Sequence, residues 1–464
     1  MADGFISTEL VPLAQKNYLQ RRFYSALVPT VKFLAAAELE EFGSGNGGTI
    51  IRTVAGRKAP VLTALTPGND AVPQPTQYEW YRTTVGQYVG SDDVPMNQAY
   101  GLIPNLYMQK MEELGVQCGT SLNLGVRNEL YKAYMAGNAV ATAAGVATTS
   151  LPISTGNGFR ETIVNGDPVP ISASNTKAIL IGTTSATAIA WTPADALQPD
   201  GPGTLTLSAN ATFNANVRVV TEDRSLIIRP NNAATIDGIS TADSAKLALF
   251  RFAAANLANH GVAPMADGYY HVHCSPFVIQ ELGSDNEYQR LFQGRPELFL
   301  QDGSIGTIGN LKFFENNQTP QPGSLNSPNP ITVPTRATQL SPHYCGELYN
   351  LSGVQIERSI VIGRDAVSQL YVPELMAFVS DAGVIGKQQS GFAMVGNQLQ
   401  MVMGPGTGQV RVIIRPPIDR TGQVVAITWS ATRGYPVRCN LLSGNSQGRY
   451  KKAVVVETGH EPIG

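Results

Sequence analysis

The stretch GSIGTIGNLKFFEN, residues 303–316, decides how the chain is interpreted, because its glycines Gly303, Gly306 and Gly309 recur at intervals of three. A phosphate-binding loop needs a helix directly after it, whose first N–H groups and dipole hold the anion. Here residues 310–315 have the residue types of a short β-strand, and no Lys-Ser or Lys-Thr pair follows the glycines. The stretch therefore predicts a tight turn with positive φ that leads into a strand, and not a nucleotide site.

The chain carries few charges for its length. Its 464 residues include 33 Lys and Arg and 35 Asp and Glu, a formal net charge of −2, and charged residues make up 15% of the sequence. An average soluble protein has about 25%, and the surface of a well-solvated monomer about 25–35%. The composition therefore predicts that other subunits cover much of the surface, and the balanced charge does not indicate a dedicated nucleic-acid or membrane-surface protein.

The cysteines indicate reduced thiols. Cys118, Cys274, Cys345 and Cys439 lie far apart and form no CxxC pair, which is not the pattern of a disulfide framework or a zinc site. The first ten residues lack the pattern of a secretory signal, and no stretch of about eighteen residues is continuously apolar. We expect a chain made in the cytoplasm, without a membrane segment.

The order of sequence patterns divides the chain into six regions, of fold class α+β. We expect an extended N-terminal arm (1–50), a long β-hairpin loop (51–95), a helical region (96–144), an inserted β-rich domain (145–232), a mixed α/β domain (233–395) and C-terminal strands (396–464). The insertion is predicted because residues 139–217 contain only six charged residues in 79, with short β-runs between turn dipeptides.

Apolar spacing predicts several helices and strands. Within 96–144 it predicts one helix from Pro104 to Gly115 and a second helix with an apolar stripe from Leu122, which stops at Gly137. Further on, a capping-box pattern at residues 240–243 predicts the start of a helix whose stripe is Leu247, Phe250, Ala254 and Leu257. A strand at 269–273 and a helix opening with Ser275-Pro276 follow.

A serine-hydrolase motif occurs near the C-terminus. Gly444-Asn-Ser446-Gln-Gly448 matches G-x-S-x-G, and Ser446, Glu457 and His460 follow in the order of a catalytic triad. A nucleophile elbow must lead from a strand into a helix, yet here strand-like runs stand on both sides, so the serine is predicted in a hairpin turn. A hydrolase that uses Ser446 is therefore a minor alternative, and we expect no catalytic residues.

Two histidine-containing pairs raise the question of a metal. His271 with His273, and His343 with Cys345, each share one face of a strand, so a four-ligand cage is conceivable. Nothing in the sequence brings the two pairs together, and half-buried histidines are common in strands. We therefore expect no metal and no cofactor.

The C-terminal strands are locally basic. Between residues 410 and 452 eight basic residues, Arg411 and Arg415 among them, stand against one acid, Asp419. With Trp429, Tyr435 and Tyr450 interleaved, this segment could contact phosphates non-specifically. Arginine is also favoured at protein interfaces, and the overall charge of −2 favours the interface hypothesis.

A family resemblance is carried by residues 253–315. The segments are Leu257-Ala-Asn-His-Gly-Val-Ala-Pro264, Gly268-Tyr-Tyr-His-Val-His-Cys-Ser-Pro276, Glu281-Leu282 and above all Gly303–Glu315. They resemble the major capsid proteins of tailed bacteriophages, specifically the coat family of N-4-like phages with the HK-97-like fold. Looser similarity covers residues 85–93, which resemble the return strand of that family's extended loop, and residues 424–429; residues 145–232 depart from the pattern.

The resemblance implies a coat subunit that self-assembles through hexamers and pentamers into an icosahedral shell around double-stranded DNA. It implies an arm beneath one neighbour, an extended loop over another, a peripheral domain with a spine helix (96–144), and an axial domain (233–395). Candidate inter-subunit contacts are Trp80, Tyr81, Tyr88, Arg21, Arg22, Arg411 and Arg415. Scaffold, portal and decoration proteins are the expected further partners, the virion is the expected location, and assembly is expected in the bacterial cytoplasm.

One alternative from another class stays open beside the hydrolase. The low-charge β insert is also typical of a phage decoration or fibre protein. Fibres show coiled-coil or β-solenoid repeats, and the sequence has no repeat of fixed period.

Overall fold

A computed structural model describes most of the chain in thirteen stretches. These are residues 32–41, 48–55, 78–95, 106–164, 167–196, 201–221, 226–294 and 306–320, then 350–371, 398–404, 408–415, 424–437 and 452–460, with gaps at 234 and 351, and a few isolated residues besides. The fold is α+β: three six-stranded sheets and several helices in the described part of the chain. Among the helices of these stretches, none is both long enough and apolar enough to cross a membrane.

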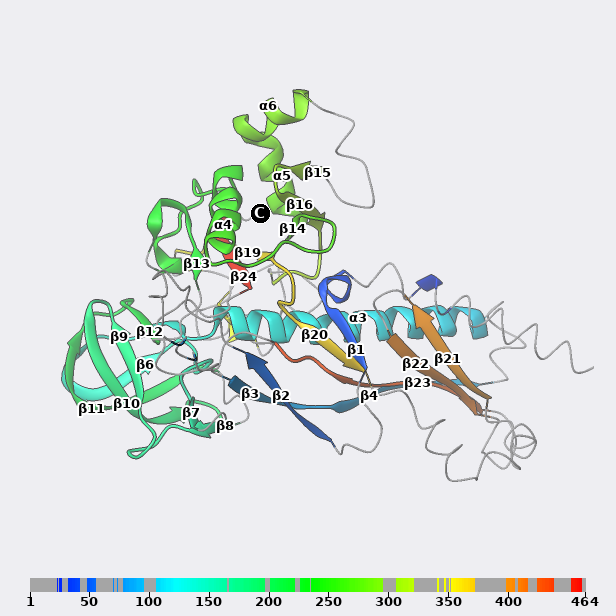
Figure 1. The fold of residues 1–464 in the computed structure, drawn as a ribbon, viewed down its shortest axis with the longest axis horizontal. Helices are drawn as coiled ribbons and strands as arrows, with labels where there is room; N and C mark the ends of the chain where they lie inside the picture. The colour runs from blue at the N-terminus through cyan, green and yellow to red at the C-terminus, as the bar shows by residue number, and fades with distance from the viewer. Residues whose placement is uncertain are drawn as a thin grey trace, which may run out of the picture.

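The first sheet lies along a long helix, α3 (Leu106–Met135). Its strands follow the order β1 (Glu38–Glu41), β20 (Ser368–Tyr371), β23 (Val424–Gly434), β22 (Gly408–Arg415) and β21 (Gln398–Gly404), with β4 (Gly86–Pro95) paired to β23. Figure 1 shows α3 running across the molecule with these strands beside it. Val412, Ile427 and Trp429 from the sheet are buried with Met111 and Leu122 of the helix. Apolar burial against α3 therefore stabilises this layer.

The helix α3 is continuous, so the prediction of two helices separated at Gly115 is wrong. A Cβ at Gly115 would lie 2.5 Å from the carbonyl oxygen of Phe23, and one at Gly125 would lie 2.5 Å from the ring of Tyr435. Glycine stands at these positions because other parts of the chain pack closely against the helix backbone. The side chains of Met111, Leu114, Leu122, Val126 and Leu130 are buried along α3.

The N-terminal segment docks where α3 meets the rest of the molecule. Phe33 and Leu34 are fully buried, and the Oδ1 atom of Asn123 on α3 accepts hydrogen bonds from the backbone N–H groups of Lys32 and Leu34, each at 3.0 Å. The strand β1 then pairs in parallel with β20. These contacts hold residues 32–41 to the body of the subunit.

The predicted hairpin is present, but it is shorter than the region 51–95. Strand β2 (Thr49–Ala55) pairs antiparallel with β3 (Tyr78–Thr84), and the two make a sheet of their own. The chain then passes Val85 and enters β4, which pairs with β23 along its whole length. Residues 86–95, with Tyr88, therefore belong to the first sheet and not to the protruding hairpin, which corrects the predicted placement of Tyr88.

The second sheet forms the β-rich domain. Its order is β5 (Asn138–Val140), β12 (Arg218–Thr221), β9 (Lys177–Ile181), β10 (Thr184–Pro193), β11 (Gly203–Phe213) and β6 (Gly145–Ile153), and the hairpin of β7 (Glu161–Val164) and β8 (Asp167–Pro170) adds a further small sheet. Apolar side chains from one face, including Leu151, Leu205 and Ile179, pack with Phe159 in a separate core. The sheet thus begins before residue 145, the expected start of the insertion, and it ends before residue 232.

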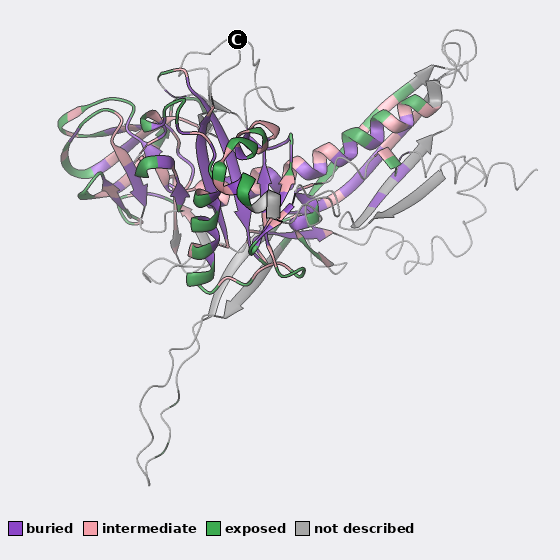
Figure 2. Ribbon diagram, turned by 90° about the horizontal axis from the view of Figure 1, so that it is seen from above, coloured by how far each residue is buried: buried purple, intermediate pink, exposed green. Residues whose placement is uncertain are grey.

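The third sheet is the centre of the molecule. Its order is β13 (Ile227–Ile228), β24 (Ala453–His460), β19 (Gln355–Ile362), β14 (Tyr270–Cys274), β16 (Leu311–Glu315) and β15 (Gly306–Ile308). Ile360 and Ile362 join the core with α3, whereas Val361 joins the core with α4 (Leu247–Asn259), as the two-residue period of a strand requires. Figure 2 shows these strands as a largely buried layer. The sheet is therefore covered on both faces.

Of the two predicted helix starts in the central unit, that of α5 is confirmed and that of α4 is not. Ser275 caps α5 (Pro276–Ser284) by accepting from the backbone N–H of Val278, and α6 (Asn286–Gly294) follows. The predicted start of α4 is wrong: Asp243 does accept hydrogen bonds from the N–H and hydroxyl of Ser240, but the helix begins only at Leu247. The capping-box residues close a turn, because their hydrogen bonds form equally well outside a helix.

The glycine-rich stretch 303–316 enters this central sheet. β15 and β16 pair antiparallel with Ile308 opposite Leu311, which leaves Gly309 and Asn310 as a two-residue turn, and Gly309 has a φ of +62°. Gly306 is buried in β15 with a φ of +150°, and Gly303 lies outside the described residues. A strand and not a helix follows the glycines, so the turn has none of the geometry of a phosphate-binding loop.

One small strand pair and three short helical turns complete the described elements. Strands β17 (Leu340–Ser341) and β18 (Gly346–Glu347) pair with each other. The turns of 3-10 helix are η2 (Leu34–Ala36), η3 (Pro230–Asn232) and η4 (Ile236–Gly238).

Candidate assembly surfaces

The hairpin of β2 and β3 is the first candidate surface. Within the described part of the chain, the two strands pair with each other over seven residues and with no other strand. The backbone of Trp80 lies opposite Thr53 and that of Tyr81 opposite Arg52, so the two aromatic residues occupy opposite faces of the ribbon. An isolated two-stranded hairpin is only marginally stable in water. A hairpin of this kind therefore requires a packing partner.

The strand β4 is the second candidate surface, and it exposes two adjacent apolar residues. Tyr88 is 38% exposed and Val89 is 55% exposed, on alternate faces of the strand. The Tyr88 ring lies 6.2 Å from the ring of Tyr435, tilted by 48°. Partial burial, and to a lesser extent the carboxylate of Glu129, raises the pKa of Tyr88. The ring is thus half packed against its own subunit and half available to a partner.

The basic C-terminal strands provide the third candidate surface. The backbone of Arg411 lies opposite Ser430 and that of Arg415 opposite Ala426, so the two arginines share one face of β22. Val410 and Val412, at the alternate positions, belong to the core with α3. The arginine positions therefore lie on the face of the sheet away from the helix.

Several other residues of the basic segment are engaged inside the subunit. Arg433 is buried, and its guanidinium lies 5.8 Å from the centre of the Tyr371 ring. Lys452 forms an ion pair of 3.4 Å with Asp365. Trp429 is buried and donates a 3.2 Å hydrogen bond to Gln117. The hypothesis that Trp429 and Tyr435 offer interleaved aromatic rings to nucleic acid is therefore wrong, since both rings lie in the core with α3.

The remaining sequence candidates lie outside the described residues. These are Arg21 and Arg22 of the arm, Tyr450, Ser446 of the hydrolase motif, and His343 and Cys345 of the second metal-like pair.

The proposed triad residues that are described have other partners. Glu457 accepts hydrogen bonds from the Nε atoms of Arg229 at 2.7 Å and Arg358 at 2.9 Å. His460 lies three residues further along β24, on the other face, with its Nδ1 atom 2.6 Å from Glu281. The acid and the base of the motif thus do not contact each other, and this speaks against a hydrolase.

His271 and His273, the described histidines of the metal-like pair, also have different contacts. His271 is partly exposed and its Nε2 atom lies 2.8 Å from Asp267. His273 is buried between the rings of Phe33 and Phe314, with ring centres at 4.8 and 5.4 Å. Burial, with smaller contributions from His271 and Lys32, lowers the pKa of His273 to about 3. Among the described residues no group of three or more metal-ligating side chains occurs.

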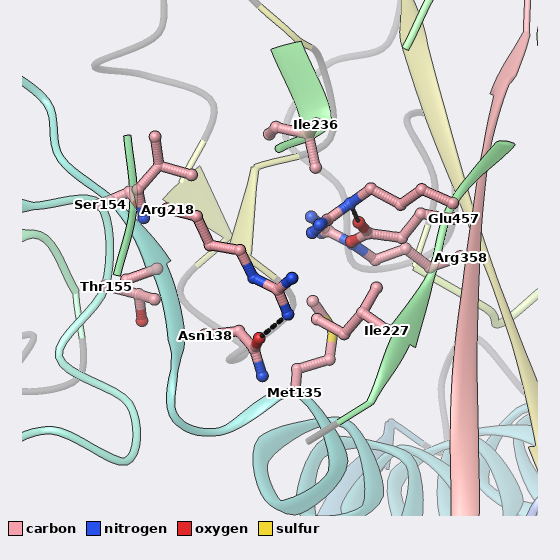
Figure 3. A pocket seen from close by; sticks show the side chains of 12 residues that line it. Met135, Asn138, Ser154, Thr155, Arg218, Ile227, Ile236, Arg358 and Glu457 are labelled. Atoms are coloured by element: carbon pink, nitrogen blue, oxygen red, sulfur yellow. Dashed lines mark hydrogen bonds and ion pairs between the residues drawn. The ribbon is translucent and has the colours of Figure 1, made fainter. Parts of the chain in front are cut away.

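The sequence gives no signal for the buried charges around Glu457. Burial alone would raise the pKa of its carboxyl group, but Arg229 and Arg358 outweigh burial and hold this pKa below its usual value. Glu457 lies 228 residues from Arg229 and 99 residues from Arg358 in the sequence, and the three side chains meet only because β13, β24 and β19 are neighbours in the central sheet. They line a hollow next to the β-rich domain, shown in Figure 3.

Comparisons with known proteins give structural similarities only. No family model matches the sequence, and no curated protein sequence matches it. The chain is similar to the solved structure described as "Cyanophage Pam1 capsid asymmetric unit", with a TM-score of 0.46, 12% identity, and coverage of 94% of this chain and 92% of that one. It is also similar to "Capsid of Ralstonia phage GP4", with a TM-score of 0.45, 12% identity, and coverage of 93% and 88%. For "Capsid structure of the Cyanophage P-SCSP1u" the TM-score is 0.44, the identity 9%, and the coverage 93% and 89%.

Proposed function

We propose that the chain is a coat subunit: a structural major capsid protein that assembles through hexamers and pentamers into an icosahedral phage head around double-stranded DNA. The observation that carries the proposal is the hairpin of β2 and β3, which has no strand partner beyond itself in the described chain and yet joins directly to β4 of the first sheet. Such a hairpin gains a packing partner when it lies over a neighbouring copy.

The composition supports the same proposal. A subunit with 15% charged residues is poorly suited to a fully solvated surface. The exposed apolar surface on β4 also supports a covering subunit, because the exposed residues Tyr88 and Val89 are adjacent in the strand that follows the hairpin. Aromatic residues are enriched in the buried centres of protein interfaces. We therefore infer that Trp80, Tyr81 and Tyr88 contribute to contacts between subunits.

The sequence resemblance gives the proposal its detail. Residues 253–315 are similar to the coat family of N-4-like phages, and their glycine turn and following strand build the edge of the central sheet. On this basis we assign the arm to residues 1–50, the spine helix to α3, and the axial domain to the unit around α4 and α5. The β-rich domain is an insertion at the surface of the shell.

Partners and location follow from a coat role. Arg411 and Arg415 share one face of β22, and we assign them to contacts with a neighbouring subunit. The inner face of the shell would meet packaged DNA without reading its sequence. Scaffold, portal and decoration proteins are the further partners, the location is the virion, and assembly takes place in the bacterial cytoplasm.

A decoration or fibre protein is the second candidate function. It is favoured by the β-rich domain, which has its own core and few charges. A decoration protein would add to a shell made by other subunits and would not form one by itself.

Electron microscopy of the purified protein, with light scattering on the same sample, separates the two functions. A coat subunit is expected to give closed shells, or rings of five and six subunits, when salt and crowding agents promote assembly. Under the same conditions a monodisperse monomer that binds preformed phage shells would contradict the coat proposal and support the decoration protein.

A further inference from the structure

The imidazole of His273, on β14, holds the anchoring ring of the N-terminal segment, residues 32–41. The ring of Phe33 stacks on this imidazole with centres 4.8 Å apart and planes at 29°, and the ring of Phe314 from β16 stacks on it at 5.4 Å and 18°. Phe33 is fully buried and His273 is 2% exposed. The segment therefore docks on an aromatic side chain that can take up a proton.

The docked arrangement accommodates only the neutral form of this imidazole. Both ring nitrogens of His273 are buried, and neither has a hydrogen-bond partner among the described residues. A neutral imidazole carries one N–H donor, whereas an imidazolium carries two donors and a full charge. Burying a charge without a partner costs far more than burying a neutral polar group. Burial is accordingly the main cause that lowers the pKa of His273 to about 3, with His271 and Lys32 as smaller causes.

The charged groups closest to His273 add to this cost. Lys32 reaches the imidazole from the N-terminal segment and His271 from the same strand, and both disfavour a further positive charge. The acid beside them, Asp267, is bonded to the Nε2 atom of His271 at 2.8 Å and lies 3.5 Å from the Nζ atom of Lys312 on β16. Its carboxylate is thus committed to two other cations.

The elements behind the stacked rings present groups that are bonded elsewhere. On β19, Ile360 lies opposite His273, and Arg358, two residues earlier, is bonded to Glu457. On α3, the ring of Tyr131 meets Phe33 edge-on, and its hydroxyl donates to the carbonyl oxygen of Arg358. Arg127 of the same helix donates to the carbonyl oxygen of Gln318 at 3.0 Å. A proton on His273 would therefore join a site already supplied with cations.

Hydrogen bonds attach the rest of the segment. The amide oxygen of Asn123 accepts from the backbone N–H groups of Lys32 and Leu34, and the Nζ atom of Lys32 donates to the carbonyl oxygen of Glu315 at 2.7 Å. The N–H of Glu38 donates to the carbonyl oxygen of residue 367 at 3.0 Å, and β1 pairs with β20 over four residues. None of these donors and acceptors titrates between pH 5 and pH 7.5. Among these contacts, His273 is the group that responds to mild acid.

We propose that His273 is an acid-sensitive latch: protonation of its imidazole releases Phe33 and undocks the N-terminal segment from α3 and the central sheet. Undocking exposes the imidazole to water, where its pKa returns toward the ordinary value of 6.5. The undocked state then binds a proton that the docked state does not. The ratio of undocked to docked chains is therefore smallest above pH 6.5, and it rises about tenfold for each pH unit below that value, down to about pH 3.

Hydrogen–deuterium exchange of the purified, unassembled full-length chain at pH 7.5 and pH 5 tests the latch. The readout is the amides of Leu34 and Glu38, which donate to other elements in the docked state. After correction for the intrinsic exchange rate at each pH, their opening constant should be about 30-fold larger at pH 5. Amides of β10 and β11, in the separate core of the β-rich domain, serve as an internal reference and should change little.

A rise of less than about threefold at Leu34 and Glu38, or an equal rise in the reference strands, would overturn the proposal. The pH range ends above the ordinary range of carboxyl groups, so general acid unfolding does not contribute. The latch acts within one subunit and is measured on free subunits, so its failure would leave the coat proposal untouched.

Two histidine variants separate the latch from a general effect of acid. His273→Phe keeps a stacked ring and removes the proton, so the opening constant should no longer change with pH. His271→Phe is the matched control on the same strand and should retain a rise of at least about tenfold, because His273 is unchanged. Should His273→Phe not fold, His273→Leu replaces it and should be equally insensitive to pH. A wild-type rise in a folded variant that lacks the His273 imidazole, or loss of the rise in His271→Phe, would overturn the proposal.

Discussion

The long helix α3 and the hairpin of β2 and β3 are opposite cases within one subunit. α3 is 30 residues long, and its apolar stripe is covered by the first sheet, the central sheet and the N-terminal segment. The hairpin has two strands of seven residues, which pair only with each other in the described chain. One element completes its packing inside the subunit, while the other forms strand pairs only with itself in the described chain, and we propose that a neighbouring copy covers it.

Hydrogen bonds strengthen the contrast. The hydroxyl of Tyr131 donates to the carbonyl oxygen of Arg358 at 2.8 Å, and that of Tyr134 donates to the carbonyl oxygen of Ala366 at 2.8 Å. Both side chains are fully buried on α3. Mutations around α3 should therefore change the stability of the subunit, and mutations in the hairpin should change its assembly.

The largest effect is expected from the hairpin. The double variant Trp80→Ala, Tyr81→Ala should prevent assembly while leaving the free energy of unfolding of the free subunit within about 0.5 kcal/mol of wild type, because we propose that these residues contact a neighbouring subunit and not their own. Light scattering and urea unfolding on the same preparations measure the two quantities. Trp191→Ala, a half-buried tryptophan of the β-rich domain, is the control and should show the reverse: lower stability with assembly retained. Shells at wild-type yield from the double variant would show that Trp80 and Tyr81 do not contribute to contacts between subunits.

The docking of the N-terminal segment onto α3 should give the next largest effect. Phe33 is fully buried against Tyr131 and His273, so Phe33→Ala should lower the free energy of unfolding by about 3–5 kcal/mol through the lost burial and the cavity left behind. Leu39→Ala in the same segment, where the side chain is 40% exposed, should cost less than about 1 kcal/mol. Equal costs for the two variants, measured by urea unfolding, would contradict this account of the segment.

The buried imidazole of His273, which stacks on Phe33, predicts that the free energy of unfolding depends on pH. Its pKa is about 3 in the folded chain, against 6.5 as the ordinary value, so between these values the unfolded chain binds the additional proton. Stability from this residue is therefore complete above pH 6.5 and falls as the pH decreases, by about 1.4 kcal/mol per unit. Between pH 6.5 and pH 5 wild type should lose about 2 kcal/mol relative to His273→Phe, which keeps the stacked ring and removes the titration. Parallel stability curves for the two proteins would show that this imidazole is not a buried neutral group.

The smallest effect comes from the glycines of the helices. Gly115→Ala should destabilise by about 1–3 kcal/mol, because the added Cβ meets the backbone of Phe23 and the helix propensity of alanine cannot offset the clash. Gly283→Ala in α5 is a matched control, since a Cβ there meets nothing within 4 Å, and it should stabilise by up to about 1 kcal/mol. The thermal unfolding transition should thus move in opposite directions for the two variants, and a shift in the same direction would show that Phe23 and Ala26 do not pack on α3.

The sequence predicts the local elements of this fold well where a single pattern decides them. The apolar stripe of α4 and the strand that follows Gly309 both form as expected, because period and turn chemistry act over a few residues. The break predicted at Gly115 fails because close approach by a distant segment, and not helix termination, explains that glycine. Local rules cannot distinguish the two causes.

Non-local contacts account for the rest. Tyr88 was expected on the hairpin, but its strand pairs with β23, more than 300 residues away. Glu457 and its two partners, Arg229 and Arg358, likewise come together only through the order of strands in the central sheet. A pattern of residue types contains no information on which strands become neighbours, so neither the charged hollow nor the partners of β4 could be predicted.

Hydrogen–deuterium exchange, measured on free subunits and on assembled particles, shows whether a neighbouring copy covers the hairpin of β2 and β3. We expect the backbone amides of residues 49–55 and 78–84 to exchange rapidly in the free subunit and to become protected on assembly. Amides of α3 should be protected in both states, because that helix is already complete. Equal protection of the hairpin before and after assembly would contradict the claim that a neighbouring copy covers it.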